Sequence, residues 1–141
     1  MRPRRNLTTR YSTQWAVVTG ASDGIGEALC HQLAKSGINI IMVSRTESKM
    51  NKVAMDLGQY NIKTKIVQYD FTILSSAEKA KELTDKLDAA TQGLDIGILV
   101  NNVGMAWAGP YHTQPIQKIF DMLYVNCAST AVLSRYYLEK W

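Results

Sequence analysis

The segment WAVVTGASDGIG, residues 15–26, constrains the fold of this chain more than any other feature. It reads as a buried strand that ends in a glycine-rich turn and opens a helix. Gly20, Gly24 and Gly26 stand where a backbone would pass close to a phosphate, and the first N–H groups of a helix attract anions. A tight turn without a ligand would use the same residues, but the flanking strand and helix favour a dinucleotide pyrophosphate site.

Apolar strands and amphipathic helices alternate along the rest of the chain. Such alternation is typical of a parallel sheet that helices cover on both faces. We therefore predict an α/β fold with a doubly wound parallel sheet. The expected strands are residues 16–19, 38–44, 64–69 and a segment within 95–101. The expected helices are residues 24–36, 48–57, a helix capped by Ser75 and Glu78 that ends near Gly93, and a long helix from about Pro115 almost to Trp141.

Charge and composition narrow the class of protein. The chain has 141 residues, 46% of them hydrophobic, and a net charge of +4. Residues 1–14 carry this excess, because they hold four arginines and no acid. We interpret 1–14 as a basic N-terminal arm, a solvated leader or the stub of a longer N-terminus. We expect residues 15–141 to form one domain, because this length suffices for a core of its own.

The same features limit the partners that we expect. The apolar runs have the length of strands, so we expect no transmembrane segment in this chain. The arm could contact nucleic acid, an anionic membrane or an import receptor, but we favour a solvated segment and expect no nucleic-acid partner. Cys30 and Cys127 suit free thiols, and no spacing of cysteine and histidine predicts a metal site.

A basic residue follows the second expected strand. About twenty residues after the glycine turn, NAD-binding folds usually carry an acid for the ribose 2′-hydroxyl. This chain has Ser44 and Arg45 there instead. An arginine fits a 2′-phosphate, so we expect NADP(H) as the cofactor. A solvated arginine at the end of a strand is the alternative.

Polar residues also follow the third and fourth expected strands, at the edge where ligands of doubly wound sheets bind. Asp70 either accepts a hydrogen bond from the adenine amino group or caps the next turn. Asn101 and Asn102 precede Gly104. These two amides either brace neighbouring loops and line the path of the ribose, or they form a simple turn.

Together these residues resemble the short-chain dehydrogenase/reductase family. TGASDGIG matches that family's TGxxxGxG turn, and NNVG matches its NNAG motif with Val103 in place of alanine. The segment YVNCAST carries Asn126 where the family has a helix asparagine. WAVVTGASDGIG, SRT and DIGILVNNVG look most like the branch of 17-beta-hydroxysteroid dehydrogenases, very-long-chain 3-oxoacyl-CoA reductases and hydroxysteroid dehydrogenase-like proteins.

The resemblance implies an NADP-dependent oxidoreductase that interconverts carbonyl and hydroxyl groups on a lipid-like small molecule of steroid or fatty-acyl type. It also implies that residues 15–141 are the N-terminal portion of a dinucleotide-binding Rossmann domain whose strands lie in the order 3-2-1-4. The sheet would be incomplete, because the fourth strand would lack its next neighbour. The resemblance implies a homodimer when the protein is complete. Many members of that branch lie in the endoplasmic reticulum membrane. The acid-free start of the chain would also suit a mitochondrial leader, and a cytoplasmic location stays open.

The resemblance further implies roles for single residues. Asn126 would be catalytic, because the family's asparagine positions a water for proton relay. The residues expected to bind the cofactor are Gly20, Ser22, Asp23, Gly24, Ile25, Gly26, Arg45, Asp70, Asn101, Asn102 and Gly104.

The family's remaining catalytic residues are a serine on the next strand and a Tyr-x-x-x-Lys pair on the next helix. Tyr136 and Lys140 have that spacing, but they stand on the same expected helix as Asn126, about 15 Å further along its axis. We interpret them as packing and helix-end residues. We therefore expect this chain alone to be unstable and inactive, as the cofactor-binding half of a reductase. The alternative is a non-catalytic dinucleotide-binding protein of the same fold that lacks the tyrosine.

Overall fold

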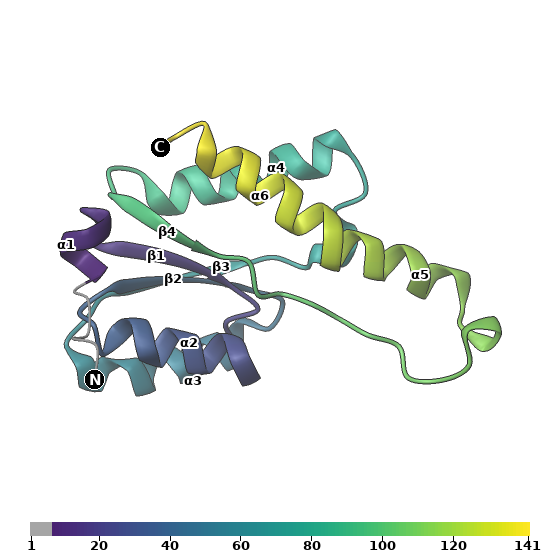
Figure 1. The fold of residues 1–141 in the computed structure, drawn as a ribbon, viewed down its shortest axis with the longest axis horizontal. Coiled ribbons are helices and arrows are strands. Elements are labelled where there is room, and N and C mark those ends of the chain that lie inside the picture. The colour runs from purple at the N-terminus through teal and green to yellow at the C-terminus, as the bar shows by residue number, and fades with distance from the viewer. Residues whose placement is uncertain (1–6) are drawn as a thin grey trace.

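The structure is one parallel sheet between two layers of helices (Figure 1). The computed structural model describes residues 7–141. Its strands are β1 (Trp15–Thr19), β2 (Asn39–Ser44), β3 (Thr64–Gln68) and β4 (Ile96–Val100). Their spatial order is β3-β2-β1-β4, and every neighbouring pair is parallel. The predicted fold class and strand order are therefore confirmed.

Each face of the sheet has its own hydrophobic core. α2 (Gly24–Ala34) and α3 (Glu47–Leu57) cover one face, and α4 (Ala77–Thr91) and α6 (Ser129–Leu138) cover the other (Figure 1). Successive side chains of a strand point to opposite faces. Val17 of β1 accordingly packs in the core beneath α4 and α6, and Val18 packs in the core beneath α2 and α3. β1 and β2 are nearly continuous apolar runs, which fits strands that are buried on both faces.

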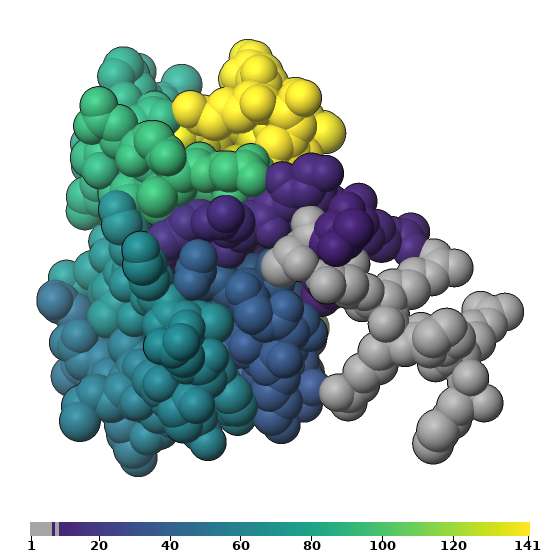
Figure 2. Space-filling model, turned by 90° about the vertical axis from the view of Figure 1, so that its left-hand side faces the viewer, coloured from purple at the N-terminus to yellow at the C-terminus, as the bar shows by residue number. Residues whose placement is uncertain are grey.

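The segment before β1 is partly folded, which differs from the solvated arm that we expected. A short helix, α1 (Leu7–Tyr11), precedes β1, and Leu7 packs against the core beneath α2 and α3. The buried Thr13 hydroxyl accepts a hydrogen bond of 2.8 Å from Gly97 N. Figure 2 shows this purple segment beside the green β4 region and the yellow C-terminal helix. The expectation for residues 1–6 lies outside the described residues.

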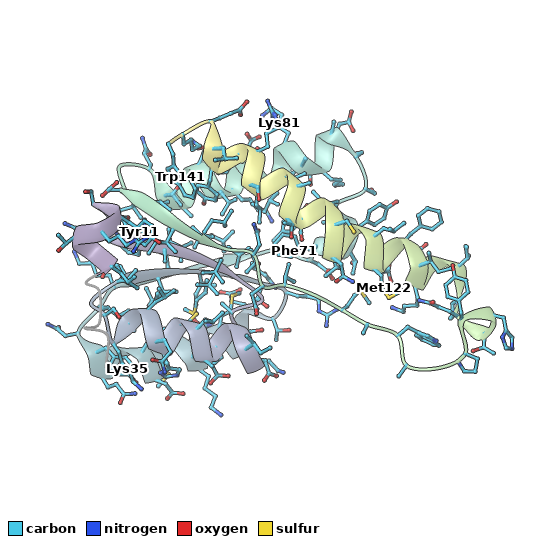
Figure 3. All side chains as sticks on the ribbon, in the orientation of Figure 1. Tyr11, Lys35, Phe71, Lys81, Met122 and Trp141 are labelled. Carbon is cyan, nitrogen blue, oxygen red and sulfur yellow. The ribbon has the colours of Figure 1, made fainter. Side chains whose placement is uncertain are left out.

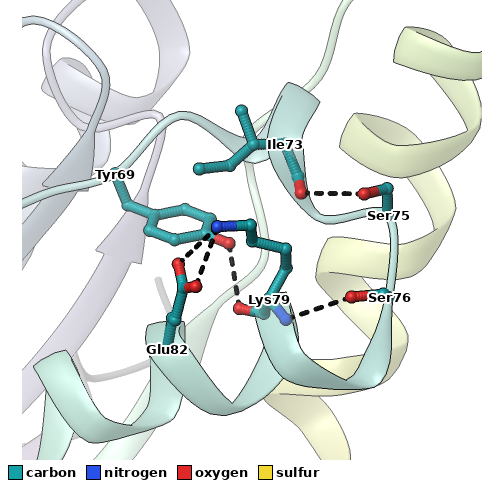
Figure 4. Close-up of polar contacts among 6 residues, drawn as sticks. All are labelled: Tyr69, Ile73, Ser75, Ser76, Lys79 and Glu82. Atoms are coloured by element: carbon teal, nitrogen blue, oxygen red, sulfur yellow. Dashed lines mark hydrogen bonds and ion pairs between the residues drawn. The ribbon is translucent and has the colours of Figure 1, made fainter.

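The start of α4 shows a small error in the predicted cap. Ser76, rather than Ser75, is the N-cap, and its hydroxyl accepts a hydrogen bond of 3.3 Å from Lys79 N (Figure 4). Ser76 has the extended backbone that an N-cap needs, whereas the Ser75 hydroxyl bonds within the preceding turn. The Tyr69 hydroxyl donates to Lys79 O at 3.1 Å, which ties the end of β3 to α4.

The last third of the chain forms one long rod. α5 (Ile116–Leu123), a π-helical turn (Tyr124–Ala128) and α6 follow one another without a break (Figure 1). The long helix was predicted to run from about Pro115 almost to Trp141, and the rod from Ile116 to Leu138 agrees with this. The π-helical turn was not foreseen. Short 3₁₀ turns complete the chain at Gly58–Tyr60, Phe71–Ile73 and Tyr111–Thr113. Within residues 7–141, no helix is both long and apolar enough to cross a membrane.

Candidate cofactor-binding site

A cleft of about 510 Å³ lies at the carboxyl ends of the strands, where the sequence placed the cofactor. In Figure 3, Phe71 of its lining lies at this end of the sheet, whereas Tyr11 and Trp141 lie at the other end. Of the residues predicted to bind the cofactor, those that line the cleft are Gly20, Ser22, Asp23, Ile25, Arg45, Asp70, Asn102 and Gly104. Gly24, Gly26 and Asn101 do not line it, and neither does Asn126.

The glycine turn brings the first strand and the first helix unusually close together. Gly20 has φ +64°, a left-handed conformation that favours glycine. At Gly26, a β-carbon would lie only 2.1 Å from Gly20 O and 2.6 Å from Nδ2 of Asn102. Gly26 therefore serves helix-to-strand packing from outside the cleft. The close packing holds the N-terminus of α2, with its free N–H groups, at the cleft.

Asn102 and Thr19 join the end of β4 to the glycine turn. Nδ2 of Asn102 donates to Thr19 O at 2.9 Å and to Gly20 O at 3.3 Å. The Thr19 hydroxyl accepts from Asn102 N at 2.9 Å and Val103 N at 3.0 Å. This bracing is one of the two roles that the sequence left open for the paired amides. Nδ2 of Asn101 instead donates to Ser134 of α6, because consecutive residues point to opposite sides.

Hydroxyl and charged groups gather where β2 ends. The hydroxyl oxygens of Ser22 and Ser44 lie 2.8 Å apart, and Arg45 follows directly. Nζ of Lys49 lies 2.9 Å from Oδ2 of Asp23, and this contact holds the pKa of Asp23 below its usual value of 3.8. Sequence reasoning missed Lys49. Its signal was a basic residue in the first turn of the helix after β2.

At the end of β3, Asp70 caps the turn that follows. Its Oδ1 accepts hydrogen bonds from Thr72 N at 3.0 Å and from the Thr72 hydroxyl at 2.9 Å. Capping was one of the two roles left open for Asp70, and Asp70 also lines the cleft. Burial raises the pKa of the neighbouring Tyr69 to about 12, so this phenol stays neutral and donates to the backbone of α4.

Asn126 braces the loop after β4. In the π-helical turn, its Oδ1 accepts a hydrogen bond from Met105 N at 2.8 Å, and its Nδ2 donates to Met105 O at 2.9 Å. π-Helical turns are often found at functional sites. Both ends of the amide are engaged by one residue, which fixes the backbone beside Gly104.

Tyr136 and Lys140 lie away from the cleft. The Tyr136 hydroxyl and Lys140 Nζ both contact Oδ1 of Asp88, at 2.8 Å and 2.6 Å. Burial and the bond to Asp88 raise the pKa of Tyr136 far above its usual 10. This pair ties α6 to α4, in agreement with the packing role inferred from the sequence.

A second cavity, of about 580 Å³, lies beside this pair at the opposite end of the sheet. Asp88, Asp95 and Lys140 supply its charged groups. Two carboxylates beside one cation suit a dinucleotide poorly, because its phosphates are anionic. Among residues 7–141 there is also no cluster of three or more histidine, cysteine or acidic side chains that could hold a metal ion.

The first cleft fits a nicotinamide dinucleotide better. It combines the start of α2 with two cations and a row of hydroxyls at the position where doubly wound sheets bind ligands. A side chain at Gly20 would meet Asn102 at 2.9 Å and the backbone of Val103 at 3.0 Å, so the floor of the cleft is closely packed.

Comparisons with known proteins agree with this geometry. The very-long-chain 3-oxoacyl-CoA reductase of Bos taurus is 35% identical over 127 residues, which are 86% of this chain and 38% of that protein. The inactive hydroxysteroid dehydrogenase-like protein 1 of Homo sapiens is 39% identical over 133 residues, which are 92% of this chain and 38% of that protein. The chain therefore spans 38% of the length of these curated relatives.

A solved structure matches in the same way. The short-chain dehydrogenase from Sphingobium yanoikuyae, in complex with NADPH, superposes with a TM-score of 0.75 at 25% identity. The match covers 86% of this chain and 46% of that one. The model of the family described as short chain dehydrogenase matches residues 14–141. On this evidence, the chain belongs to the short chain dehydrogenase family.

Proposed function

We propose that this chain forms the cofactor-binding part of an NADP(H)-dependent oxidoreductase that interconverts a carbonyl and a hydroxyl group. The observation that carries the proposal is the cleft, in which the glycine turn, the Asn102 bridge and the Arg45 side chain meet at one end of the sheet. An arginine at the end of β2, where an acid would select NAD(H), supports a 2′-phosphate. The Sphingobium neighbour, solved with NADPH, supports the same cofactor.

Each part of the cleft has a proposed task. The start of α2, where Ile25 lines the cleft, would hold the pyrophosphate through backbone N–H groups. Gly20 and Gly24 would let the backbone pass close to the phosphates, and Gly26 would hold the helix against the glycine turn. Ser22, Asp23 and Arg45 would surround the adenosine ribose, and Asp70 would face the adenine. Asn102 and Gly104 would border the second ribose. Asn101 would hold the same loop in place through its hydrogen bond to Ser134 of α6. When bound, the nicotinamide would supply or accept the hydride.

Asn126 has a proposed catalytic role through proton relay. Its Oδ1 and Nδ2 both form hydrogen bonds with the backbone of Met105. We propose that it fixes the loop and the π-helical turn against which a relay water would be ordered.

The substrate is proposed to be a steroid or fatty-acyl molecule. The names of the relatives support this class, since they include a very-long-chain 3-oxoacyl-CoA reductase and a hydroxysteroid dehydrogenase-like protein. We further propose that the complete protein is a homodimer. The exposed apolar side chains Ile116, Phe120 and Leu123 of α5 support a partner on that helix.

Cofactor binding tests the proposal. NADPH and NADH are titrated into the full-length protein, because this chain alone is expected to be unstable, and nicotinamide fluorescence reports binding. We expect NADPH to bind at least tenfold more tightly, and Arg45→Ala to remove most of that difference, because a charge-assisted hydrogen bond contributes about 1.5–3 kcal/mol. Arg135→Ala is the matched control, since Arg135 lies on α6 and pairs with Glu139. Equal affinity of the wild type for both cofactors would contradict NADP(H) dependence.

A second candidate is a non-catalytic dinucleotide-binding protein. The 39% identity with the inactive hydroxysteroid dehydrogenase-like protein 1 favours it. NADPH oxidation by the full-length protein, with 3-oxoacyl-CoA and steroid ketones as substrates, separates the two. Turnover supports the oxidoreductase, and tight NADPH binding without turnover of any substrate supports the binding protein.

A further inference from the structure

An ion pair spans the cofactor cleft where β2 ends. Nζ of Lys49, in the first turn of α3, lies 2.9 Å from Oδ2 of Asp23, the N-cap of α2. Both residues line the cleft together with Arg45. Oδ1 of Asp23 accepts a hydrogen bond of 2.8 Å from Gly24 N, so the carboxylate is held at the start of the helix.

This carboxylate is a difficulty for a cofactor that carries a 2′-phosphate. A carboxylate and a phosphate within a few ångströms of each other repel, because like charges disfavour one another's ionised form. Arg45 alone would have to overcome the repulsion and also attract the phosphate. Lys49 supplies the missing positive charge, and its contact with Asp23 neutralises the carboxylate.

The ion pair is easy to rearrange. The side chains of Lys49 and Asp23 are 56% and 73% exposed, and exposed ion pairs contribute little to stability. A lysine carries its charge on a long flexible stem. The hydroxyls of Ser22 and Ser44, which also line the cleft, offer further hydrogen bonds to a phosphate at the same place.

We propose that Lys49 is a second specificity-determining cation for NADP(H). It cancels the charge of Asp23 and, when the cofactor binds, contacts the ribose 2′-phosphate together with Arg45. The inference rests on the proposed function and adds a residue to it. It also explains how an acidic residue can stand in the glycine turn of a cleft that binds a 2′-phosphate.

Two small probes isolate the effect. Adenosine 2′,5′-bisphosphate and 5′-AMP differ only by the 2′-phosphate, and neither requires the nicotinamide side of the site. Calorimetric titration of the full-length protein gives the ratio of the two affinities. We expect the wild type to prefer the bisphosphate at least tenfold, and Lys49→Ala to reduce this ratio about fivefold to tenfold while the affinity for 5′-AMP is unchanged.

A double-mutant cycle tests the role of Asp23. Without the Asp23 carboxylate, less positive charge is needed to attract the 2′-phosphate. Asp23→Asn in the Lys49→Ala background should therefore restore a large part of the preference for adenosine 2′,5′-bisphosphate over 5′-AMP. Lys49→Arg should keep the preference. Lys52→Ala is the matched control, because Lys52 is an exposed residue of the same helix that does not line the cleft.

The outcomes separate the two proposals. A wild type that binds both probes equally overturns NADP(H) dependence itself. A wild type that prefers the bisphosphate, with a Lys49→Ala variant that keeps the full ratio, overturns only the role of Lys49. A Lys49→Ala variant that loses both affinities in the same proportion also overturns it, because the effect would then be structural.

Discussion

β2 and β4 belong to the same parallel sheet, but solvent reaches them very differently. Five of the six residues of β2 are buried, whereas every residue of β4 is partly exposed. β2 has β1 and β3 as neighbours, and β4 pairs with β1 alone among the described strands. The comparison shows that β1 and β2, which have a neighbour on each side, are buried by contacts within this chain, whereas β3 and β4 are the edge strands of the described sheet.

The same contrast divides the candidate site. The adenosine side of the cleft is built from short hydrogen-bonded turns after β1, β2 and β3. On the side of β4, a loop without regular structure leads to the short turn Tyr111–Thr113 before α5 begins. Cofactor affinity should therefore depend mainly on the first region, and substrate contacts should depend on the second.

Truncation of core side chains tests the contrast most strongly. Ile41→Ala in β2 removes a fully buried side chain and should lower the free energy of unfolding by about 4 kcal/mol. Leu99→Ala in β4 should cost only about 1–2 kcal/mol, because this side chain is partly exposed. Urea unfolding of both variants gives the two values. Equal losses would show that β4 is as well buried as β2.

The close approach at the glycine turn gives the next largest effect. Gly26→Ala places a β-carbon 2.1 Å from a backbone oxygen, so the helix or the turn must move, at a cost of about 3 kcal/mol. Gly58→Ala is the control, because space is open there and its φ is −54°. That variant should be neutral or slightly stabilised. If both variants unfold at the same urea concentration, the turn is not tightly packed.

The link between the two regions is the Thr19 hydroxyl. Thr19→Val leaves the N–H groups of Asn102 and Val103 without their acceptor, which should cost about 2 kcal/mol and weaken NADPH binding. Thermal unfolding and the NADPH titration measure the two effects. Thr84→Val is a suitable comparison, because the Thr84 hydroxyl bonds to Lys81 O within α4 and Thr84 does not line the cleft. If Thr19→Val has the stability and the NADPH affinity of the wild type, the Thr19 hydroxyl does not couple the glycine turn to the loop after β4.

The smallest effect concerns acid stability. Hydrogen bonds from Lys140 and Tyr136 hold the pKa of Asp88 below its usual 3.8 in the folded chain. The resulting stabilisation is present above pH 3.8 and is lost as the pH falls through the lower folded-state pKa. Because Asp88 is largely exposed, we expect Asp88→Asn to remove only about 0.5 kcal/mol at pH 7. Urea unfolding at pH 7 and pH 3 gives the difference in the free energy of unfolding between the wild type and Asp88→Asn. This difference should be smaller at pH 3, and a larger one would contradict a lowered pKa of Asp88.

Periodic patterns made most of the fold predictable from the sequence. The first two strands are apolar runs that end at turn residues, and the helices repeat apolar residues on one face, so the type of each element and its place along the chain followed from spacing. The spatial order of the strands came from the resemblance to the family. The boundaries of the helices were harder to predict. Ser75 and Ser76 are chemically identical candidates for a cap, and only the backbone conformation selects Ser76. The π-helical turn at Tyr124–Ala128 has no spacing signal of its own.

The site was predictable where a motif fixed the backbone, and less so where side chains from different elements meet. The glycine turn and Arg45 both line the expected cleft. The sequence could not tell that Asn102 faces the turn while Asn101 faces α6, because this depends on how β4 is rotated. Lys49 had a local signal, a basic residue in the first turn of α3, but its contact with Asp23 depends on the packing of α3 beside α2.

The central claim is that the dinucleotide binds at the carboxyl ends of the strands. Amide hydrogen exchange, followed by mass spectrometry with and without NADP⁺, tests it most directly. The account predicts slower exchange in residues 20–26, 44–49 and 101–105, with no change in 88–95 or 137–141. Protection confined to the second cavity, or no protection anywhere at saturating NADP⁺, would contradict it.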